Sequence, residues 1–279
     1  VRNLASTLRY GVRYLFEALP RIFTLWFDYG ADKPEITTFM REWFICMPKY
    51  LFIAVLPQLL SRLLHQDPEI KEALVAMLVE IGIARTDEAL WYIVPVSRSK
   101  DQQRSYAAAT IMSNAARQAT TTEVRKKLTI GKDLVKELIN VCCMGVHPRF
   151  KQMSASKDLP KLQKIIKASK HILIPIQRLL AVSPDSKSLS AAPSSPLPVE
   201  PIRFVELNET VKLMTSLMKP KKIEILASDG KHYGFLCKKE DKGDMRKDAR
   251  LMEFVSVVNR SLEQNPLSRQ KRLGVRTYA

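Results

Sequence analysis

The chain has 279 residues, of which 46% are hydrophobic and 26% are charged. These values are ordinary for globular proteins, and they exclude an intrinsically disordered chain, a collagen and a small disulfide scaffold. The charge is unusual, because 45 Lys and Arg against 28 Asp and Glu give a formal net charge of +17 at pH 7. This excess favours a polyanionic neighbour, such as a nucleic acid, a nucleotide or an anionic membrane, or else a basic surface that faces solvent.

The cysteines and histidines show no spacing typical of a site. No CxxC pair occurs and the histidines are scattered, so we expect neither a disulfide framework nor a metal site, and we expect a reducing compartment. The adjacent Cys142 and Cys143 are interpreted as a small pair in a helical core. The most apolar stretch, residues 50–60, is too short to span a bilayer, so it is expected to be a buried helix and no membrane partner is predicted.

Residues 1 to about 181 show helical periodicity almost throughout. Asp67 before Pro68 predicts a helix start, and Thr86, followed by two acidic residues, predicts the start of the next helix with its hydroxyl as the cap. The segment 159–180 repeats the apolar spacing and predicts a further helix. We expect about eight helices, arranged as antiparallel pairs stacked in a row.

The composition changes at Ser183, where the run SPDSKSLSAAPSSPLPVEP begins. Because this run is rich in Ser, Pro and Ala, residues 183–201 are predicted to be a flexible linker. The chain is therefore expected to have three parts, which are a helical scaffold over residues 1–182, the linker, and a small α+β unit over residues 202–279.

The last part contains strand patterns and one helix pattern. Strands are predicted for three runs, residues 202–207, 222–226 and 233–238. The second and third runs are expected to pair as a hairpin around the turn Ser228-Asp229-Gly230. A helix with apolar residues at core spacing is expected from about 246 to 262, and a further strand is expected at 272–279.

The hairpin and the helix after it have the layout of a kinase small lobe. In such a lobe a turn covers the nucleotide phosphates, a lysine on a strand neutralises them, and an acidic residue on the following helix orients the lysine. Lys238, at the end of the second hairpin strand, stands where that lysine is needed. The spacing has low specificity by itself, because any basic hairpin followed by a helix would match it.

Longer runs of residues are more specific than the spacing. Three lie in the last part, KPKKIEILASDGKHYGFLCK (219–238), DMRKDARLMEF (244–254) and GVRTYA (274–279), and three lie in the helical part, LPRIFTLWFDYG, LPQLLSRLLH and ALWYIVPVSRS. The first set resembles the phosphatidylinositol-kinase-related protein kinases, and within them the ATR-type DNA-damage checkpoint kinases. The second set looks like the end of a FAT domain. The resemblance implies a mostly α fold, in which a FAT-type helical-repeat scaffold precedes a small α+β kinase N-lobe with antiparallel strands and one long helix.

The same resemblance implies a nucleotide site. One residue matches the lysine that binds the ATP phosphates, three match the loop that covers them, and one matches the acidic residue near that lysine. The cofactor-binding residues predicted in this way are Lys238 for the first role, Ser228, Asp229 and Gly230 for the second, and Asp248 for the third.

Helix geometry favours Asp248 over Glu253 as the partner of Lys238. At 100° per residue, with Leu251 at zero, Asp248 lies about 60° away, on the edge of the apolar stripe that is expected to face the sheet. Glu253 lies about 200° away, on the opposite side of the helix.

Two features depart from the family pattern. The chain has GDMR at residues 243–246 where the family usually has DDLR, and it has no DRH-type catalytic loop and no DFG. Those two motifs supply the catalytic base and the Mg²⁺ ligands, so we expect no catalytic residue and no metal ligand within this segment. ATP and Mg²⁺ are expected as cofactors of the whole kinase, and the segment is expected to be a fragment that is truncated before the hinge and inactive alone.

The resemblance implies a Ser/Thr protein kinase that transfers the γ-phosphate of ATP to protein substrates in DNA-damage and replication checkpoint signalling. It also implies a nuclear location, an ATR-interacting regulatory subunit, a homodimer formed through the helical scaffold, and an indirect association with DNA. Two alternatives remain open at this point. They are a lipid kinase of the same superfamily, and a non-catalytic basic helical scaffold that binds nucleic acid or a partner protein.

Overall fold

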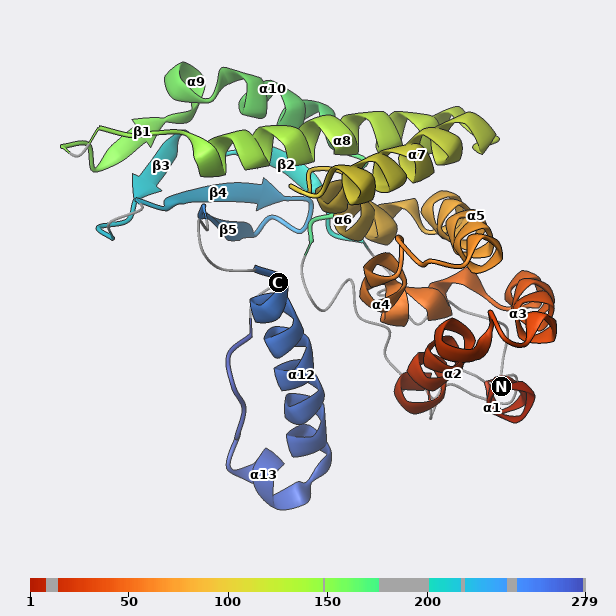
Figure 1. The fold of residues 1–279 in the computed structure, drawn as a ribbon. Helices are drawn as coiled ribbons and strands as arrows, with labels where there is room; N and C mark the ends of the chain where they lie inside the picture. Colours follow the sequence, from red (N-terminus) through yellow and green to blue (C-terminus); the bar gives the residue numbers. More distant parts are fainter. Residues whose placement is uncertain (9–14, 148, 176–200, 217–218, 240–244, 278–279) are drawn as a thin grey trace.

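The computed structural model describes residues 1–8, 15–147, 149–175, 201–216, 219–239 and 245–277, so most of the predicted linker lies outside the described residues. As predicted, the fold is mostly α-helical with one small antiparallel sheet. Figure 1 shows the first helices stacked one after another, α8 (Thr122–Cys143) lying across the sheet, and α12 (Met245–Gln264) extending away from it. Within the described ranges, no helix has both the length and the apolar composition of a membrane span.

The first helical elements enclose an aromatic core. They are α1 (Arg2–Thr7), α2 (Leu15–Tyr29), α3 (Pro34–Cys46), the 3₁₀ helix η1 (Lys49–Val55) and α4 (Leu56–Ser61). Trp26 and Phe52 are completely buried, and the indole N–H of Trp26 donates to the hydroxyl of Thr37 at 2.9 Å. The apolar stretch at residues 50–60 is largely buried as predicted, but it forms η1 and α4 and not one helix, because Pro57 lies in the first turn of α4, where proline favours a helix start.

Longer helices follow, α5 (Pro68–Ala84), α6 (Thr86–Val96), α7 (Gln102–Gln118) and α8. α5 begins as predicted, since the Asp67 carboxylate accepts a hydrogen bond from the N–H of Ile70 at 2.9 Å. α6 also begins at the predicted residue, but the prediction that the Thr86 hydroxyl caps it is wrong. This hydroxyl donates to the carbonyl oxygens of Gly82 and Ile83, so it joins the start of α6 to the end of α5.

The sheet is built around β4. Its strands in the described residues are β1 (Gln152–Ser154), β2 (Phe204–Leu207), β3 (Thr210–Leu213), β4 (Lys221–Ala227) and β5 (His232–Cys237). β5 pairs with one edge of β4, which confirms the predicted hairpin, while β2 and β3 pair with the two ends of the other edge. β1 extends the sheet beyond β3. The sequence patterns predict neither β1 nor β3, and β1 comes from the part of the chain that precedes the predicted linker.

In the described residues, the helix predicted at 159–180 ends at Ala168, and the predicted residues 176–180 lie outside the described ranges. The chain forms α9 (Ala155–Asp158) and α10 (Pro160–Ala168) and then leaves the helix. Beyond α10 the backbone bonds to the sheet, since the N–H of Ile174 donates to the carbonyl of Ile202 at 2.9 Å and Leu173 forms a bridge with Arg203. After Ala168 the described chain therefore pairs with the residues that lead into β2 and does not continue the helix.

Aromatic stacking joins the helices to the sheet. Phe204 is completely buried, and its ring centroid lies 6.0 Å from that of Trp91 in α6 and 6.3 Å from that of Phe235 in β5. The indole N–H of Trp91 donates to the carbonyl of Leu173 at 3.0 Å. Because such rings contribute both buried area and stacking energy, the helices and the sheet share one continuous core.

The predicted helix at 246–262 is present as α12, and α13 (Pro266–Gln270) follows it. Its apolar residues do not form a buried stripe in the described structure, because Leu251 is 56% and Phe254 is 64% exposed. Figure 1 shows the same arrangement, with α12 and α13 projecting from the rest of the molecule.

The strand predicted at 272–279 is wrong for its described part. Residues 273–277 form no strand. They run back beside α12, where the side-chain amide of Asn259 donates to the carbonyl of Val275 and accepts from its N–H, both at 2.7 Å. The polar amide thus satisfies backbone groups that a partner strand would otherwise satisfy.

The cysteine pair also differs from the expectation. Cys142 is partly buried, whereas Cys143 is exposed. Adjacent residues on a helix point in directions about 100° apart, so only one of the two faces the core.

Candidate functional site

The turn between β4 and β5 consists of Ser228, Asp229 and Gly230, as predicted. The N–H of Gly230 donates to the carbonyl of Ala227 at 3.0 Å, and Gly230 has a φ of 73°, which favours glycine. Arg203 holds the turn from the side of β2. The N–H of Ser228 donates to the carbonyl of Arg203 at 3.0 Å, and the N–H of Arg203 donates to Ser228 Oγ at 2.9 Å.

The carboxylate of Asp229 already has partners. The hydroxyl of Tyr233 donates to it at 2.7 Å, and the N–H of Lys231 donates to it at 3.2 Å. Partial desolvation acts to raise the pKa of Asp229, but these hydrogen bonds outweigh it and hold the pKa below its ordinary value. Asp229 is therefore negatively charged at neutral pH, and its side chain repels a phosphate.

Lys238 lies at the other end of the hairpin from this turn. β5 runs antiparallel to β4, with His232 opposite Leu226 beside the turn and Cys237 opposite Lys221 at the far end. A strand of six residues spans about 20 Å, and a triphosphate group is much shorter than that. The structure therefore does not bring the predicted turn and Lys238 to the same phosphate.

The backbone that adjoins Lys238 is the connection between β3 and β4. β3 pairs with Lys221 on one edge of β4 and Cys237 pairs with it on the other, so this connection and Lys238 meet at the same end of the sheet. Its described residues include Ser216 and Lys219, and the N–H of Lys219 donates to the carbonyl of Ser216 at 2.9 Å. Sequence reasoning missed these residues because β3 was not predicted. If β3 had been assigned, the connection between β3 and β4 would have been placed beside Lys238.

Asp248 lies in the first turn of α12, and its side chain is exposed. Leu251, on the next turn of the same helix, is exposed as well. The described structure therefore does not show this face of α12 packed on the sheet, and the pairing of Asp248 with Lys238 stays a prediction.

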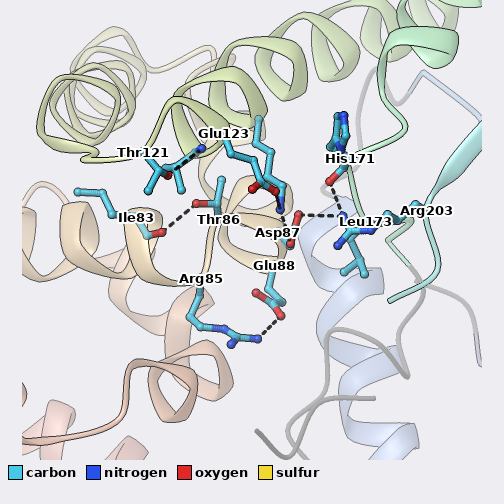
Figure 2. Close-up of polar contacts among 12 residues, drawn as sticks. Ile83, Arg85, Thr86, Asp87, Glu88, Thr121, Glu123, His171, Leu173 and Arg203 are labelled. Atoms are coloured by element: carbon cyan, nitrogen blue, oxygen red, sulfur yellow. Dashed lines mark hydrogen bonds and ion pairs between the residues drawn. The ribbon is translucent and has the colours of Figure 1, made fainter. Parts of the chain in front are cut away.

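A partly buried ion cluster joins the turn to the helices, and no sequence pattern predicts it (Figure 2). Asp87, in the first turn of α6, accepts a hydrogen bond from Lys127 Nζ of α8 at 2.9 Å, and Arg203 Nη1 lies 3.8 Å from its other oxygen. Arg203 also donates to the carbonyl of His171. Because the backbone of Arg203 holds Ser228, this one residue connects the turn to α6, and Asp87 extends the connection to Lys127 of α8.

Beside this cluster, Glu88 is buried and pairs with Arg85 (Figure 2). Burial raises the pKa of Glu88, and the attraction of the Arg85 guanidinium only partly offsets this effect. The described residues contain no group of His, Cys, Asp and Glu that could hold a metal ion.

Comparison with known proteins agrees with this fold. Residues 35–138, from α3 to α8, match the family described as serine/threonine-protein kinase ATR-like, HEAT repeats. The serine/threonine-protein kinase ATR of Arabidopsis thaliana is 32% identical over 299 residues, which cover 99% of this chain and 11% of that protein. Protein kinase rad3 of Schizosaccharomyces pombe is 27% identical over 306 residues, covering 100% of this chain and 13% of that protein. The chain thus spans only about a tenth of the length of these relatives.

Solved structures show the same architecture. One of them is described as the FAT and kinase domain of CtTel1. It matches with a TM-score of 0.68 at 18% identity, and the match covers 94% of this chain and 18% of the CtTel1 chain. The structure of the open conformation of CtTel1 matches with a TM-score of 0.71 at 18% identity, and this match covers 94% of this chain and 10% of the CtTel1 chain. These likenesses concern the fold, whereas the relatives above match in sequence along almost the whole chain. The chain therefore corresponds to one segment of the ATR-type phosphatidylinositol-kinase-related protein kinases, as its residues predict.

Proposed function

We propose that this segment belongs to a Ser/Thr protein kinase, with a FAT-type scaffold at residues 1–182, a linker at 183–201 and part of the kinase small lobe at 202–279. The whole kinase would use ATP and Mg²⁺ to phosphorylate protein hydroxyls. The main support is that relatives named serine/threonine-protein kinase ATR and protein kinase rad3 align with 99% and 100% of this chain. The alignment therefore includes the sheet and Lys238.

Lys238 is the residue to which we assign contact with the ATP phosphates. Its side chain is exposed directly after β5, while Cys237, one residue earlier, is 5% exposed and anchors the strand. The ammonium group is therefore presented by an anchored strand end, a suitable position for neutralising charge on a transferred phosphoryl group. The bound ATP supplies that group, and the Mg²⁺ ligands are expected outside this segment.

The biological setting is part of the same proposal. It comprises DNA-damage and replication checkpoint signalling, a nuclear location, an ATR-interacting regulatory subunit and an indirect association with DNA. A homodimer through the helical scaffold is supported by a similar structure, which is described as a complete CtTel1 dimer with C2 symmetry and has a TM-score of 0.71.

The test compares two substitutions in the full-length kinase. Lys238→Ala is expected to abolish phosphate transfer from ATP to a protein substrate. Ser228→Ala is the matched control, because the turn is about 20 Å from Lys238 along β5, and it is expected to leave the KM for ATP unchanged. Transfer retained in Lys238→Ala would contradict the assignment of Lys238. A raised KM for ATP in Ser228→Ala would place the phosphates at the turn, and transfer only to phosphatidylinositol would indicate a lipid kinase.

A further inference from the structure

Two cysteines from different parts of the fold meet beside a buried lysine. Cys142 lies in the last turn of α8, and Cys237 is the last residue of β5. Lys221 stands directly opposite Cys237 across the β4–β5 ladder. Its ammonium group donates to the backbone carbonyl of Cys142 at 3.4 Å and to that of Met144. The lysine therefore holds the end of α8 against the strand position that carries Cys237.

The two cysteines lie on either side of Lys221 and differ in accessibility. Cys237 is 5% exposed and Lys221 is 2% exposed, whereas Cys142 is only partly buried. Lys221 brings the two cysteines together, because it pairs with Cys237 in the ladder and its ammonium group lies 3.4 Å from the carbonyl oxygen of Cys142. A small reagent in solvent can thus reach Cys142 first, and the enclosed thiol of Cys237 lies next to it.

The Cys237 thiol and, to a smaller extent, the charge of Lys221 make Cys142 the more acidic thiol. The pKa of Cys142 is lowered to about 7. Interaction with the Cys237 thiol is the main cause, the positive charge of Lys221 lowers the pKa further, and partial burial acts in the opposite direction. The same interaction, together with burial, raises the pKa of Cys237.

Lys221 gives a second reason for a thiolate at Cys142. Among the described residues, no carboxylate forms an ion pair with Lys221. A buried positive charge without an ionic partner is costly, and ionisation of Cys142 supplies one. Cys142 is therefore the thiol that reacts first, and Cys237 is the thiol that reacts with the oxidised Cys142.

We propose that Cys142 and Cys237 are a modification site, at which a peroxide converts the two thiols into a reversible disulfide. The Cys142 thiolate attacks the O–O bond and becomes a sulfenic acid, and the hydroxide that leaves takes up a proton as water. The Cys237 sulfur then attacks the sulfenic sulfur and displaces a second water as the S–S bond forms. In total, two thiols and one hydrogen peroxide give one disulfide and two waters, with sulfur oxidised and peroxide oxygen reduced.

This disulfide covalently joins the end of α8 to the end of β5. It therefore restrains the helical part relative to the β4–β5 hairpin. A dithiol reductant reverses it, as expected for a transient disulfide in a reducing compartment. The thiol chemistry does not depend on the proposed kinase function.

The test maps cysteine linkages in the full-length protein after treatment with hydrogen peroxide. Free thiols are blocked, the protein is digested without reductant, and the peptides are identified by mass spectrometry. We expect one peptide that links Cys142 to Cys237 and disappears after dithiothreitol treatment. Cys143→Ser is the matched control, because Cys143 is the exposed neighbour of Cys142, and it is expected to leave this link intact. Cys142→Ser is expected to remove it.

Cys237→Ser tests the order of the two steps. Without the second thiol, Cys142 is expected to stop at the sulfenic acid, which a 1,3-diketone probe captures. The proposal is overturned if Cys142 and Cys237 remain free thiols while the exposed Cys46 is oxidised, or if the peroxide links Cys143 instead. The mapping of the unsubstituted protein decides between these outcomes even if Cys237→Ser does not fold.

Discussion

The guanidinium of Arg203 lies 3.8 Å from the carboxylate of Asp87, and the backbone of Arg203 exchanges two hydrogen bonds with Ser228. One residue thus contacts α6 through its side chain and the β4–β5 turn through its main chain. Asp87 also accepts a hydrogen bond from Lys127 of α8. Because the two roles use different atoms of Arg203, substitution of its side chain tests the ion pair without removing the main-chain bonds that hold the turn.

Arg203→Ala removes the ion pair with Asp87 and the hydrogen bond to the carbonyl of His171. The side chains of Arg203 and Asp87 are 28% and 23% exposed, so solvent screens the pair only partly. We expect the free energy of unfolding, measured with urea, to fall by about 1–2 kcal/mol. Arg203→Lys keeps the positive charge, so its free energy of unfolding is expected to fall by less than that of Arg203→Ala. Equal losses in the two variants would show that the charge contributes nothing.

Gly131 allows α8 to approach α6 closely. A Cβ at this position would lie 2.5 Å from side-chain atoms of Leu90, which is itself 1% exposed and has little room to move. We expect Gly131→Ala to lower the free energy of unfolding by about 1–3 kcal/mol, although alanine is the better helix former. Gly145→Ala is the control, because no atom lies within 4 Å of its Cβ position. A comparable loss at Gly145 would contradict the steric explanation.

Sequence reasoning succeeds where a few neighbouring residues determine the structure. The start of α5 depends on Asp67 and the N–H of Ile70, and the hairpin turn depends on Gly230 and the carbonyl of Ala227. Each of these contacts spans three residues, so the local pattern contains all the necessary information. The same holds for the periodicity that predicts α12, since the sequence of one helix determines which residues share a face.

The features that sequence reasoning missed depend on residues that are far apart in the chain. β1 has three residues and β3 has four, and β1 pairs Met153 with Val211, which lies beyond the predicted linker. The contact of Arg203 with Asp87 joins residues that are even farther apart in sequence. An apolar stripe likewise does not specify its partner, which is why Leu251 could be predicted to face a core and still be exposed. Because β3 was not predicted from the sequence, the position of Lys238 beside the β3–β4 connection could not be predicted either.

Phe204 is the residue through which the helices and the sheet share a core. It is completely buried between the rings of Trp91 and Phe235. Phe204→Ala is expected to cost about 3–5 kcal/mol of folding free energy, because it leaves a cavity at this junction. Phe254→Ala is the matched control, since Phe254 is 64% exposed, and it is expected to change stability by less than about 0.5 kcal/mol. Thermal unfolding of the two variants, followed by circular dichroism, would contradict this account if it ranked them in the opposite order.

Glu88 predicts a dependence of stability on pH that is opposite to the usual one for a carboxylate. Burial raises its pKa above the ordinary value of 4.5, so the folded protein takes up this proton before the unfolded chain does. The contribution of Glu88 to stability therefore increases as the pH falls from its raised pKa towards 4.5, and it is least favourable at neutral pH. Glu88→Gln removes this titration while keeping a similar shape. We expect the variant to be more stable relative to the unsubstituted protein at pH 7 than at pH 4.5. The measurement is the free energy of unfolding of both proteins in urea at the two pH values, and the difference, variant minus unsubstituted, should be larger at pH 7. A difference that is constant with pH, or that grows on acidification, would show that Glu88 does not titrate in this way.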